Sequence, residues 1–345
     1  MNKNPYNLIF GKEPPETISR IAQQTTVLNS FRENPPSQQI YMITGVRGSG
    51  KTVFMTEIAK ELKREKEWIV VELNSSENLM KDLAASLGSE NTLAKIFQNA
   101  RINLSIFGIG LEVKGSVPIS NIQVALTKML ESIKKHGKKV LVCIDEVTVT
   151  KYMKTFAGAF QILIRQDLPI YLLMTGLYEN INNLQNQKNL TFLYRAPKLE
   201  LNPLNLGVIA NNYKKHFGLN DSESQNMANL TMGYPFAFQT LGYCTWNSSG
   251  NYQEALPDVQ LYLEDFVYEK IWSGLSNKDK QLAYGIAKSK TGKADDIKRL
   301  ANFSDDEYSV YRNRLIKQGI ANGDNYGFLK FSLPFFDSFA SRKNM

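Results

Sequence analysis

Short apolar runs alternate with segments of helical periodicity through the first two hundred residues. The runs have the length, boundaries and β-branched or aromatic content that are typical of buried strands. They occur at residues 39–44, 68–73, 140–146, 169–177 and 191–201. Between them, apolar residues recur at helical spacing, as at Phe54, Ile58 and Leu62 after the first run. This alternation predicts an α/β fold in which a parallel sheet is sandwiched by helices.

Two further segments belong to this region. Pro14 and Pro15 end any preceding structure, and Thr17 follows them as a candidate cap of a helix over residues 17–31. Residues 102–115 alternate in polarity and pivot on Gly108 and Gly110. That pattern predicts a β-hairpin inserted into the first domain.

The segment GVRGSGKT, residues 45–52, lies between the first apolar run and the first helical segment. Its spacing is G-x-x-x-x-G-K-[ST], the pattern of a loop whose backbone N–H groups surround a phosphate at a helix N-terminus. In such a loop Lys51 reaches the β- and γ-phosphates and the Thr52 hydroxyl binds Mg²⁺. The predicted nucleotide contacts are the loop and the residue after it, namely Gly45, Val46, Arg47, Gly48, Ser49, Gly50, Lys51, Thr52 and Val53.

Two adjacent carboxylates, Asp145 and Glu146, end the third run after the four apolar residues Leu141 to Ile144. The carboxyl end of a buried parallel strand is where this architecture places its ligands. We expect Asp145 to hold Mg²⁺, directly or through water, and Glu146 to polarise the attacking water. Thr175 ends the fourth run, where two roles are open. Its hydroxyl either contacts the γ-phosphate or the water, or satisfies a backbone group at the strand end.

The last seventy residues have a different character. Ser276 is a candidate cap of one helix, and Ser304 with Glu307 fits the capping box of another. A short hairpin closed around Gly327 follows, and three helices with a hairpin outline a winged helix. Residues 276–345 hold 13 Lys and Arg against 8 Asp and Glu, so +5 of the chain's net charge of +8 lies there. The second of the capped helices begins SDDE, which is unusual for a helix that enters a major groove.

Composition limits the class of protein. The 345 residues are long enough for two or three domains, and 43% are hydrophobic. No apolar stretch approaches the length of a membrane span, and no signal peptide is evident, so we expect a cytoplasmic protein without membrane contact. Cys143 and Cys244 lie in apolar contexts, which favours buried thiols over a disulfide. The two histidines and two cysteines have no metal-ligand spacing, which argues against a zinc site.

Four stretches together carry a family resemblance: GVRGSGKT, CIDE at residues 143–146, the strand that ends at Thr175, and LYRAPKLELNPL at residues 193–204. They resemble the ATPase domains of the STAND group, and in particular the "archaeal ATPase" type that is related to AAA+ origin-recognition proteins. The resemblance implies a P-loop NTPase sheet of the ASCE type, with an extra strand between the P-loop strand and the Asp145 strand. It also implies that Glu146 is the catalytic carboxylate and that Arg195 faces the nucleotide and senses the γ-phosphate.

A second resemblance lies in GYPFAF, residues 233–238. It is similar to the G-x-P motif that opens a helix in the small helical lid of STAND proteins, which implies that Pro235 packs against the adenine or ribose. The sensor arginine common in this region of AAA+ relatives is absent from GYPFAFQ. The predicted domains are an N-terminal helical lead-in (1–37), a P-loop ATPase domain (38–204), a helical lid (205–274) and a winged helix (275–345).

These features favour one function and leave two alternatives open. The first is an ATP-binding protein and Mg²⁺-dependent ATPase that acts as a nucleotide-controlled switch, with ATP between the sheet domain and the lid and with catalysis by Lys51, Glu146 and Arg195. The second is a nucleotide-regulated, initiator-like or mobile-element DNA-binding protein, whose winged helix makes weak DNA contacts. A small-molecule kinase ranks last, because no acceptor site is visible. The expected partners are ATP and ADP, an unidentified protein, and further copies of the chain in a nucleotide-dependent oligomer.

Overall fold

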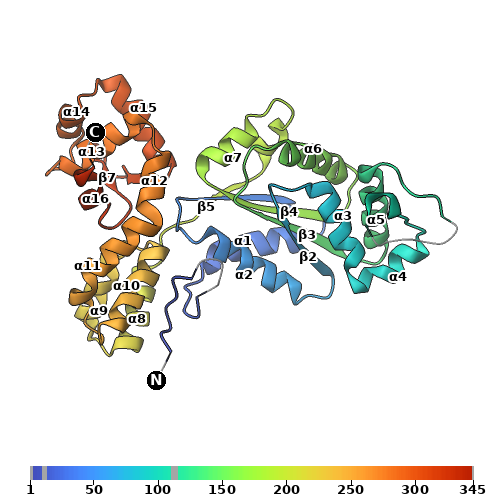
Figure 1. Ribbon diagram of the computed structural model, residues 1–345, viewed down its shortest axis with the longest axis horizontal. Coiled ribbons are helices and arrows are strands. Elements are labelled where there is room, and N and C mark those ends of the chain that lie inside the picture. The colour runs from blue at the N-terminus through green and yellow to red at the C-terminus, as the bar shows by residue number, and fades with distance from the viewer. Residues whose placement is uncertain (1–2, 10–13, 110–115, 344–345) are drawn as a thin grey trace. The chain divides into compact units, whose positions relative to one another are not determined.

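The computed structural model describes residues 3–9, 14–109 and 116–343 (Figure 1). Its contacts divide the chain into two units. One holds residues 20–44 and 51–200, and we call it the sheet unit. The other holds the described part of residues 1–19 together with residues 45–50 and 201–343, and we call it the helical unit.

The sheet unit is built on five parallel strands in the order β2-β3-β4-β1-β5. Their bounds are β1 Ile40–Thr44, β2 Trp68–Asn74, β3 Lys139–Asp145, β4 Ile170–Gly176 and β5 Lys198–Glu200. β4 lies between β1 and β3, so the extra strand that the family resemblance implied is present. All five strands point the same way, and their carboxyl ends therefore meet at one edge of the sheet.

Helices cover both faces of this sheet, with α1 and α2 on one side and α3 and α6 on the other (Figure 1). The helices are α1 Ile21–Arg32, α2 Lys51–Lys63, α3 Leu79–Ser89, α4 Asn91–Asn99, α5 Ile122–Lys135, α6 Lys151–Arg165 and α7 Tyr178–Gln185. Side chains alternate across each strand. Ile40 and Met42 join the large core under α3, α5 and α6, whereas Tyr41 packs edge-on against Phe31 of α1. Burial on both faces explains why the strands read as continuous apolar runs.

The predicted β-hairpin over residues 102–115 is wrong where the structure describes it. Residues 102–109 form no strand but contain a short 3₁₀ helix, Ser105–Phe107, and residues 110–115 lie outside the described chain. Ile102 and Leu104 are buried in the core while the Asn103 side chain accepts a hydrogen bond from the Ser105 N–H, so the alternation reflects a loop packed on the core.

The fifth strand is much shorter than expected. Thr191–Arg195 is a 3₁₀ helix, and β5 begins only at Lys198. Pro197 has no N–H to donate to a strand ladder, although its carbonyl accepts a bond from the Met42 N–H. The first helix also begins later than predicted, at Ile21 rather than after Thr17.

The helical unit begins with the chain's N-terminal residues packed against helices from residue 206 onward. Its first helices are α8 Leu206–Phe217, α9 Asp221–Leu230, α10 Pro235–Asn247, α11 Tyr252–Leu263, the π-helical turn η3 Glu264–Tyr268 and α12 Glu269–Gly274. Tyr6 is 2% exposed and contacts the rings of Tyr213, Phe217 and Phe238. Its ring also fills the space beside Gly242, where an added Cβ would lie 2.5 Å from it. Tyr6 thus anchors residues 3–9 to the core of this unit.

The remaining elements follow the order that the sequence predicts. They are α13 Asn277–Lys288, α14 Ala294–Ala301, α15 Asp305–Lys317, the antiparallel pair β6 Ala321–Asn322 and β7 Lys330–Phe331, and α16 Phe336–Arg342. The Ser276 cap and the Ser304–Glu307 capping box are confirmed. An isolated antiparallel bridge joins Lys293 to Phe328. The helices and hairpin are confirmed as elements, whereas the winged-helix assignment and the four-domain division stay predictions.

Two expectations from composition concern cysteines and membranes. Cys143 and Cys244 are both free and buried, as predicted, and burial raises the pKa of each thiol, to about 12 for Cys244. Among the helices in the described ranges, none has both the length and the apolar character that crossing a bilayer requires.

Replacing Tyr6 tests whether the N-terminal residues stabilise the helical unit. We expect Tyr6→Ala to lower the free energy of unfolding by about 3–5 kcal/mol, because it empties a buried aromatic site. Urea denaturation followed by tryptophan fluorescence measures this change. Ile9→Ala is the control, because Ile9 is 61% exposed and its loss should be nearly neutral. Equal stability of the two variants would contradict the packing of this segment.

Candidate functional site

The carboxylate of Asp145 is the centre of a hydrogen-bonded group at the carboxyl edge of the sheet. Its Oδ2 accepts a bond from the Thr52 hydroxyl at 2.7 Å, and its Oδ1 accepts bonds from the Thr175 hydroxyl and from the Glu146 N–H. Thr52 lies in the first turn of α2, Asp145 ends β3, and Thr175 lies near the end of β4. The sheet thus brings together three residues that the sequence placed in separate motifs.

Thr175 fits the second of its two predicted roles. The side chain is fully buried, and its hydroxyl accepts a hydrogen bond from the Glu146 N–H at 3.1 Å while it donates to Asp145. One hydroxyl therefore fixes both the carboxylate that ends β3 and the backbone of the next residue. A contact between Thr175 and a nucleotide stays a prediction.

Glu146 has an unusual backbone conformation. Its φ is +49°, in the left-handed region that non-glycine residues rarely adopt. The flanking bonds hold it there, because the Glu146 N–H is bonded to Thr175 Oγ1 and the Val147 N–H donates to the Thr175 carbonyl at 2.9 Å. The Glu146 side chain is exposed. Backbone strain of this kind concentrates at functional sites, and here it turns an acidic residue out of the strand beside Asp145.

The loop between β1 and α2 has the backbone of a phosphate-binding loop. Gly48 and Gly50 have φ of +77° and +83°, values that favour glycine. The helix α2 begins at Lys51 directly after the loop, so its positive N-terminal end follows the last glycine. Lys51 is 9% exposed, although it carries a charge. Consecutive backbone N–H groups beside a helix N-terminus are suited to bind phosphate.

The residues present fit the two groups that the motifs imply. Thr52 supplies a hydroxyl oxygen and Asp145 a carboxylate oxygen within 2.7 Å of each other, and hard oxygen ligands are those that Mg²⁺ prefers. The glycine-rich loop and Lys51 have the chemistry to hold the phosphates of ATP. Together they account for a magnesium nucleotide without any residue from outside the predicted motifs.

Arg195 is not brought to this group. It lies in the 3₁₀ helix that precedes β5, on the side where the edge strand begins, whereas Asp145 and Thr175 lie where their strands end. The predicted strand over residues 191–201 included Arg195, and this is wrong because only Lys198–Glu200 pairs with β1. Arg195 is exposed, and its role as a γ-phosphate sensor stays a prediction.

In the helical unit, the two motifs LNPL (201–204) and GYP (233–235) contact each other. The Leu204 N–H donates to the Gly233 carbonyl at 2.8 Å, and an added Cβ on Gly233 would lie 2.6 Å from the Leu204 carbonyl oxygen. Pro235 occupies the first position of α10, where its missing N–H costs nothing, and it is half-buried. A contact of Pro235 with adenine or ribose stays a prediction.

The residue that sequence reasoning missed is Tyr234, between the glycine and the proline of that motif. Its hydroxyl donates a hydrogen bond to the carbonyl oxygen of Arg47 in the glycine-rich loop, at 2.6 Å. The available signal was the middle position of G-x-P, which the sequence analysis left without a role.

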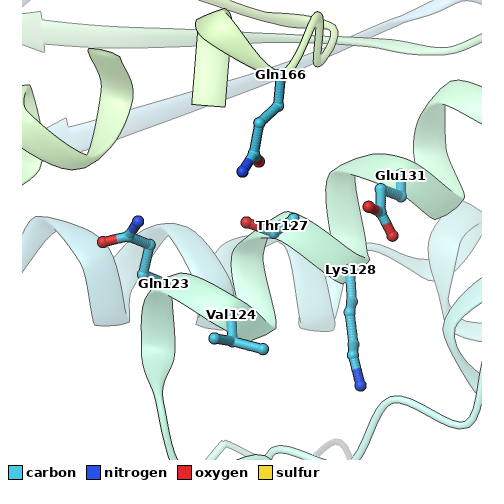
Figure 2. A pocket seen from close by; sticks show the side chains of 6 residues that line it. All are labelled: Gln123, Val124, Thr127, Lys128, Glu131 and Gln166. Atoms are coloured by element: carbon cyan, nitrogen blue, oxygen red, sulfur yellow. The ribbon is translucent and has the colours of Figure 1, made fainter. Parts of the chain in front are cut away.

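A surface pocket of about 300 Å³ lies elsewhere in the sheet unit, where Gln166 after α6 faces α5 (Figure 2). Its other lining residues are Gln123, Val124, Thr127, Lys128 and Glu131, all on α5. None of the predicted site residues lines it, and its charged and polar side chains do not converge on one point (Figure 2). The carboxyl edge of the sheet therefore stays the candidate functional site.

Comparison with known proteins agrees with this geometry. Residues 26–192 match a family described as "ATPase domain predominantly from Archaea", which covers β1 to β4 and every residue of the Asp145 group. These residues have the P-loop NTPase fold and are similar to that ATPase family. Residues 265–340 match a domain of unknown function, and no curated protein sequence matches the chain.

Solved structures support the fold. A Walker-type ATPase of Pyrococcus abyssi has a TM-score of 0.68 at 12% identity, with 94% of this chain and 96% of that one covered. Cdc6p from Pyrobaculum aerophilum has a TM-score of 0.47 at 14% identity, covering 95% and 93% of the two chains. A STAND protein of Pyrococcus horikoshii with a tetratricopeptide repeat sensor has a TM-score of 0.41 at 16% identity, covering 100% and 45%. The first likeness shows that the P-loop ATPase fold is shared, and the other two carry no further argument.

Replacing Thr175 tests whether its hydroxyl positions Asp145. We expect Thr175→Val to raise the Mg²⁺ concentration required for half-maximal nucleotide binding about tenfold, because Asp145 loses a bond of the strength found for charged acceptors. Titration of Mg²⁺ at fixed ATP, with a thermal melt alongside, measures the change. Thr175→Ser keeps the hydroxyl and should behave like the wild type. An unchanged Mg²⁺ requirement in folded Thr175→Val would remove Thr175 from the site.

Proposed function

We propose that this protein binds ATP with Mg²⁺, hydrolyses ATP to ADP and phosphate, and uses the nucleotide as a conformational switch. The observation that carries the proposal is the hydrogen-bonded group at the sheet edge, in which Asp145 joins Thr52 of the P-loop helix to Thr175 of β4 beside the strained Glu146. Such an arrangement suits phosphoryl transfer to water, which depends on positioning and charge stabilisation more than on covalent chemistry.

Each residue has a distinct part in this proposal. The buried Lys51 ammonium binds the β- and γ-phosphates and balances their charge, while the loop N–H groups bind the α- and β-phosphates. Thr52 and Asp145 hold the metal, which supplies Lewis-acid stabilisation of the charge that develops on the phosphates. Glu146, exposed and held in its left-handed conformation, accepts a hydrogen bond from the attacking water and orients it.

The hydrolysis step is tested at Glu146. We expect Glu146→Gln to leave ATP affinity within about twofold of the wild type and to slow turnover at least about a hundredfold, because the amide has the same shape but cannot act as a base. Steady-state phosphate release and equilibrium nucleotide binding measure the two effects separately. Glu77→Gln is the matched control, because Glu77 is an exposed acid in the loop after the neighbouring strand β2. Turnover that stays near the wild-type rate in Glu146→Gln would exclude Glu146 as the catalytic carboxylate.

The switch is tested by the dimensions of the protein in solution. We expect the radius of gyration with a non-hydrolysable ATP analogue to be smaller than without nucleotide, with ADP giving a smaller change, because a ligand shifts a conformational equilibrium only by its differential affinity for the two states. Small-angle scattering on the three forms measures this order. The same profile in all three, at nucleotide concentrations shown to saturate the protein, would leave an ATPase without a switch.

The DNA-binding alternative has less support, because two basic side chains of α15, Arg312 and Arg314, contact other residues of the protein. Arg312 donates to the Gly323 carbonyl at 3.0 Å, and the Arg314 Nε lies 3.4 Å from an oxygen of the fully buried Asp279. The acidic first turn of α15 also attracts cations, since Asp305 and Glu307 pair with Lys298 and Lys278 at 2.6 and 2.9 Å. These contacts engage Arg312, Arg314, Asp305 and Glu307 within the protein, so we favour the switch.

A further inference from the structure

The glycine-rich loop contains a tight turn. The peptide group at the centre of such a turn can take either of two opposite orientations, those of turn types I and II. The Ser49 N–H donates to the Val46 carbonyl at 3.2 Å, so Arg47 and Gly48 are the two central residues of the turn. Gly48 has a φ of +77°, the value of the third residue in a type II turn. Types I and II differ mainly by a rotation of the peptide between the central residues, here the peptide that joins Arg47 to Gly48.

Tyr234 holds this peptide by its oxygen. Its hydroxyl lies 2.6 Å from the Arg47 carbonyl oxygen, and its side chain is buried. Burial raises the pKa of the Tyr234 hydroxyl, so it stays a protonated donor over the physiological pH range. The position of Tyr234 is itself fixed, because its N–H donates to the Thr231 carbonyl at 2.8 Å and the neighbouring Gly233 is bonded to Leu204.

The absence of a side chain at Gly48 leaves room for the Tyr234 hydroxyl. A Cβ added to Gly48 would lie 2.1 Å from the Tyr234 hydroxyl oxygen and 3.1 Å from the Phe236 Cβ. Any other residue would therefore displace Tyr234, besides adopting a φ that strains a side chain. Gly48 and Tyr234 are therefore packed against each other in space, although they are 186 positions apart in the sequence (234 − 48).

The geometry of a peptide group links this contact to phosphate binding. In a trans peptide the C=O and N–H bonds point in opposite directions. When the Arg47 C=O is held toward Tyr234, the Gly48 N–H of the same peptide is directed away from Tyr234. A hydrogen bond at the oxygen also polarises the peptide and strengthens its N–H as a donor.

We propose that Tyr234 is a positioning residue for phosphate recognition: its hydroxyl holds the Arg47–Gly48 peptide so that the Gly48 N–H donates to a phosphate of the bound nucleotide. The inference rests on the proposed nucleotide binding and adds to it the residue that sets the orientation of one phosphate donor. The loop N–H groups bind the α- and β-phosphates, which ADP and ATP share. Tyr234 therefore acts on both nucleotides alike, unlike a γ-phosphate sensor.

The test compares two tyrosines that each donate a buried hydrogen bond to a backbone carbonyl in the helical unit. Tyr234→Phe removes the bond to Arg47 and keeps the ring. Tyr213→Phe removes a bond of 2.8 Å to the Phe238 carbonyl, away from the loop. We expect Tyr234→Phe to weaken ADP and ATP binding by the same factor, about tenfold, the size of one hydrogen bond. Tyr213→Phe should lower thermal stability without changing either affinity.

A second readout uses the protein without nucleotide. Hydrogen–deuterium exchange of a peptide that spans residues 45–52 should be faster in Tyr234→Phe than in the wild type and unchanged in Tyr213→Phe. Wild-type affinities in folded Tyr234→Phe would overturn the inference while the proposed nucleotide binding stands. A wild-type protein that binds no nucleotide would overturn the proposed function. In that case exchange still decides the geometry, because equal rates in all three proteins would show that Tyr234 does not hold the loop.

Discussion

Much of the ATPase site depends on the three hydrogen bonds that the Asp145 carboxylate accepts. They come from the Thr52 hydroxyl of α2, the Thr175 hydroxyl of β4 and the N–H of Glu146, the residue after β3. The register of the sheet makes the arrangement possible, because Ile144 pairs with Met174 and places Asp145 level with Thr175. A shift of one residue in β3 would turn Asp145 to the other face and break its bonds to Thr52 and Thr175. The buried apolar runs that fix this register are therefore a condition for the chemistry as well as for stability.

The sequence predicted this edge of the sheet because both signals involved are local. Continuous apolar runs mark doubly buried strands, and Asp145 and Thr175 lie at the ends of two of them, while Thr52 lies in the glycine-rich motif after another. The same reasoning failed at residues 102–109 and 191–195, where apolar residues occur in segments that form 3₁₀ helix and loop without strand pairing. Pairing is a property of the neighbouring strand, which a single segment does not encode. The left-handed conformation of Glu146 was also beyond prediction, since it depends on bonds to Thr175, which lies 29 residues later.

Tyr234 shows a different limit of sequence reasoning. The family resemblance drew attention to Pro235, whose place at a helix start is readable from sequence, and passed over the residue beside it. The proposed role of Tyr234 depends on the hydrogen bond from its hydroxyl to the Arg47 carbonyl, and these two residues are 187 positions apart in the sequence. Only the folded chain shows that Gly48 lacks a side chain for two reasons at once, its positive φ and the tyrosine oxygen in the place of a Cβ.

The free energy of the Tyr234 hydrogen bond limits how far this contact can shift a conformational equilibrium. A phosphate at the Gly48 N–H and Tyr234 at the Arg47 C=O act on opposite ends of one peptide, so each strengthens the other, and this coupling is reciprocal. One hydrogen bond contributes about 1 kcal/mol. Moving an equilibrium from 1:99 to 99:1 requires about 5.5 kcal/mol. Tyr234 alone therefore adjusts nucleotide affinity, and a complete switch needs more contacts that respond to the same loop. The helical unit contains one, since Val46 is buried in its core and an added Cβ on Gly319, after α15, would lie 3.5 Å from the Val46 Cβ. Movement of the loop on nucleotide binding would also change the packing of Val46 against the turn that leads from α15 into the hairpin.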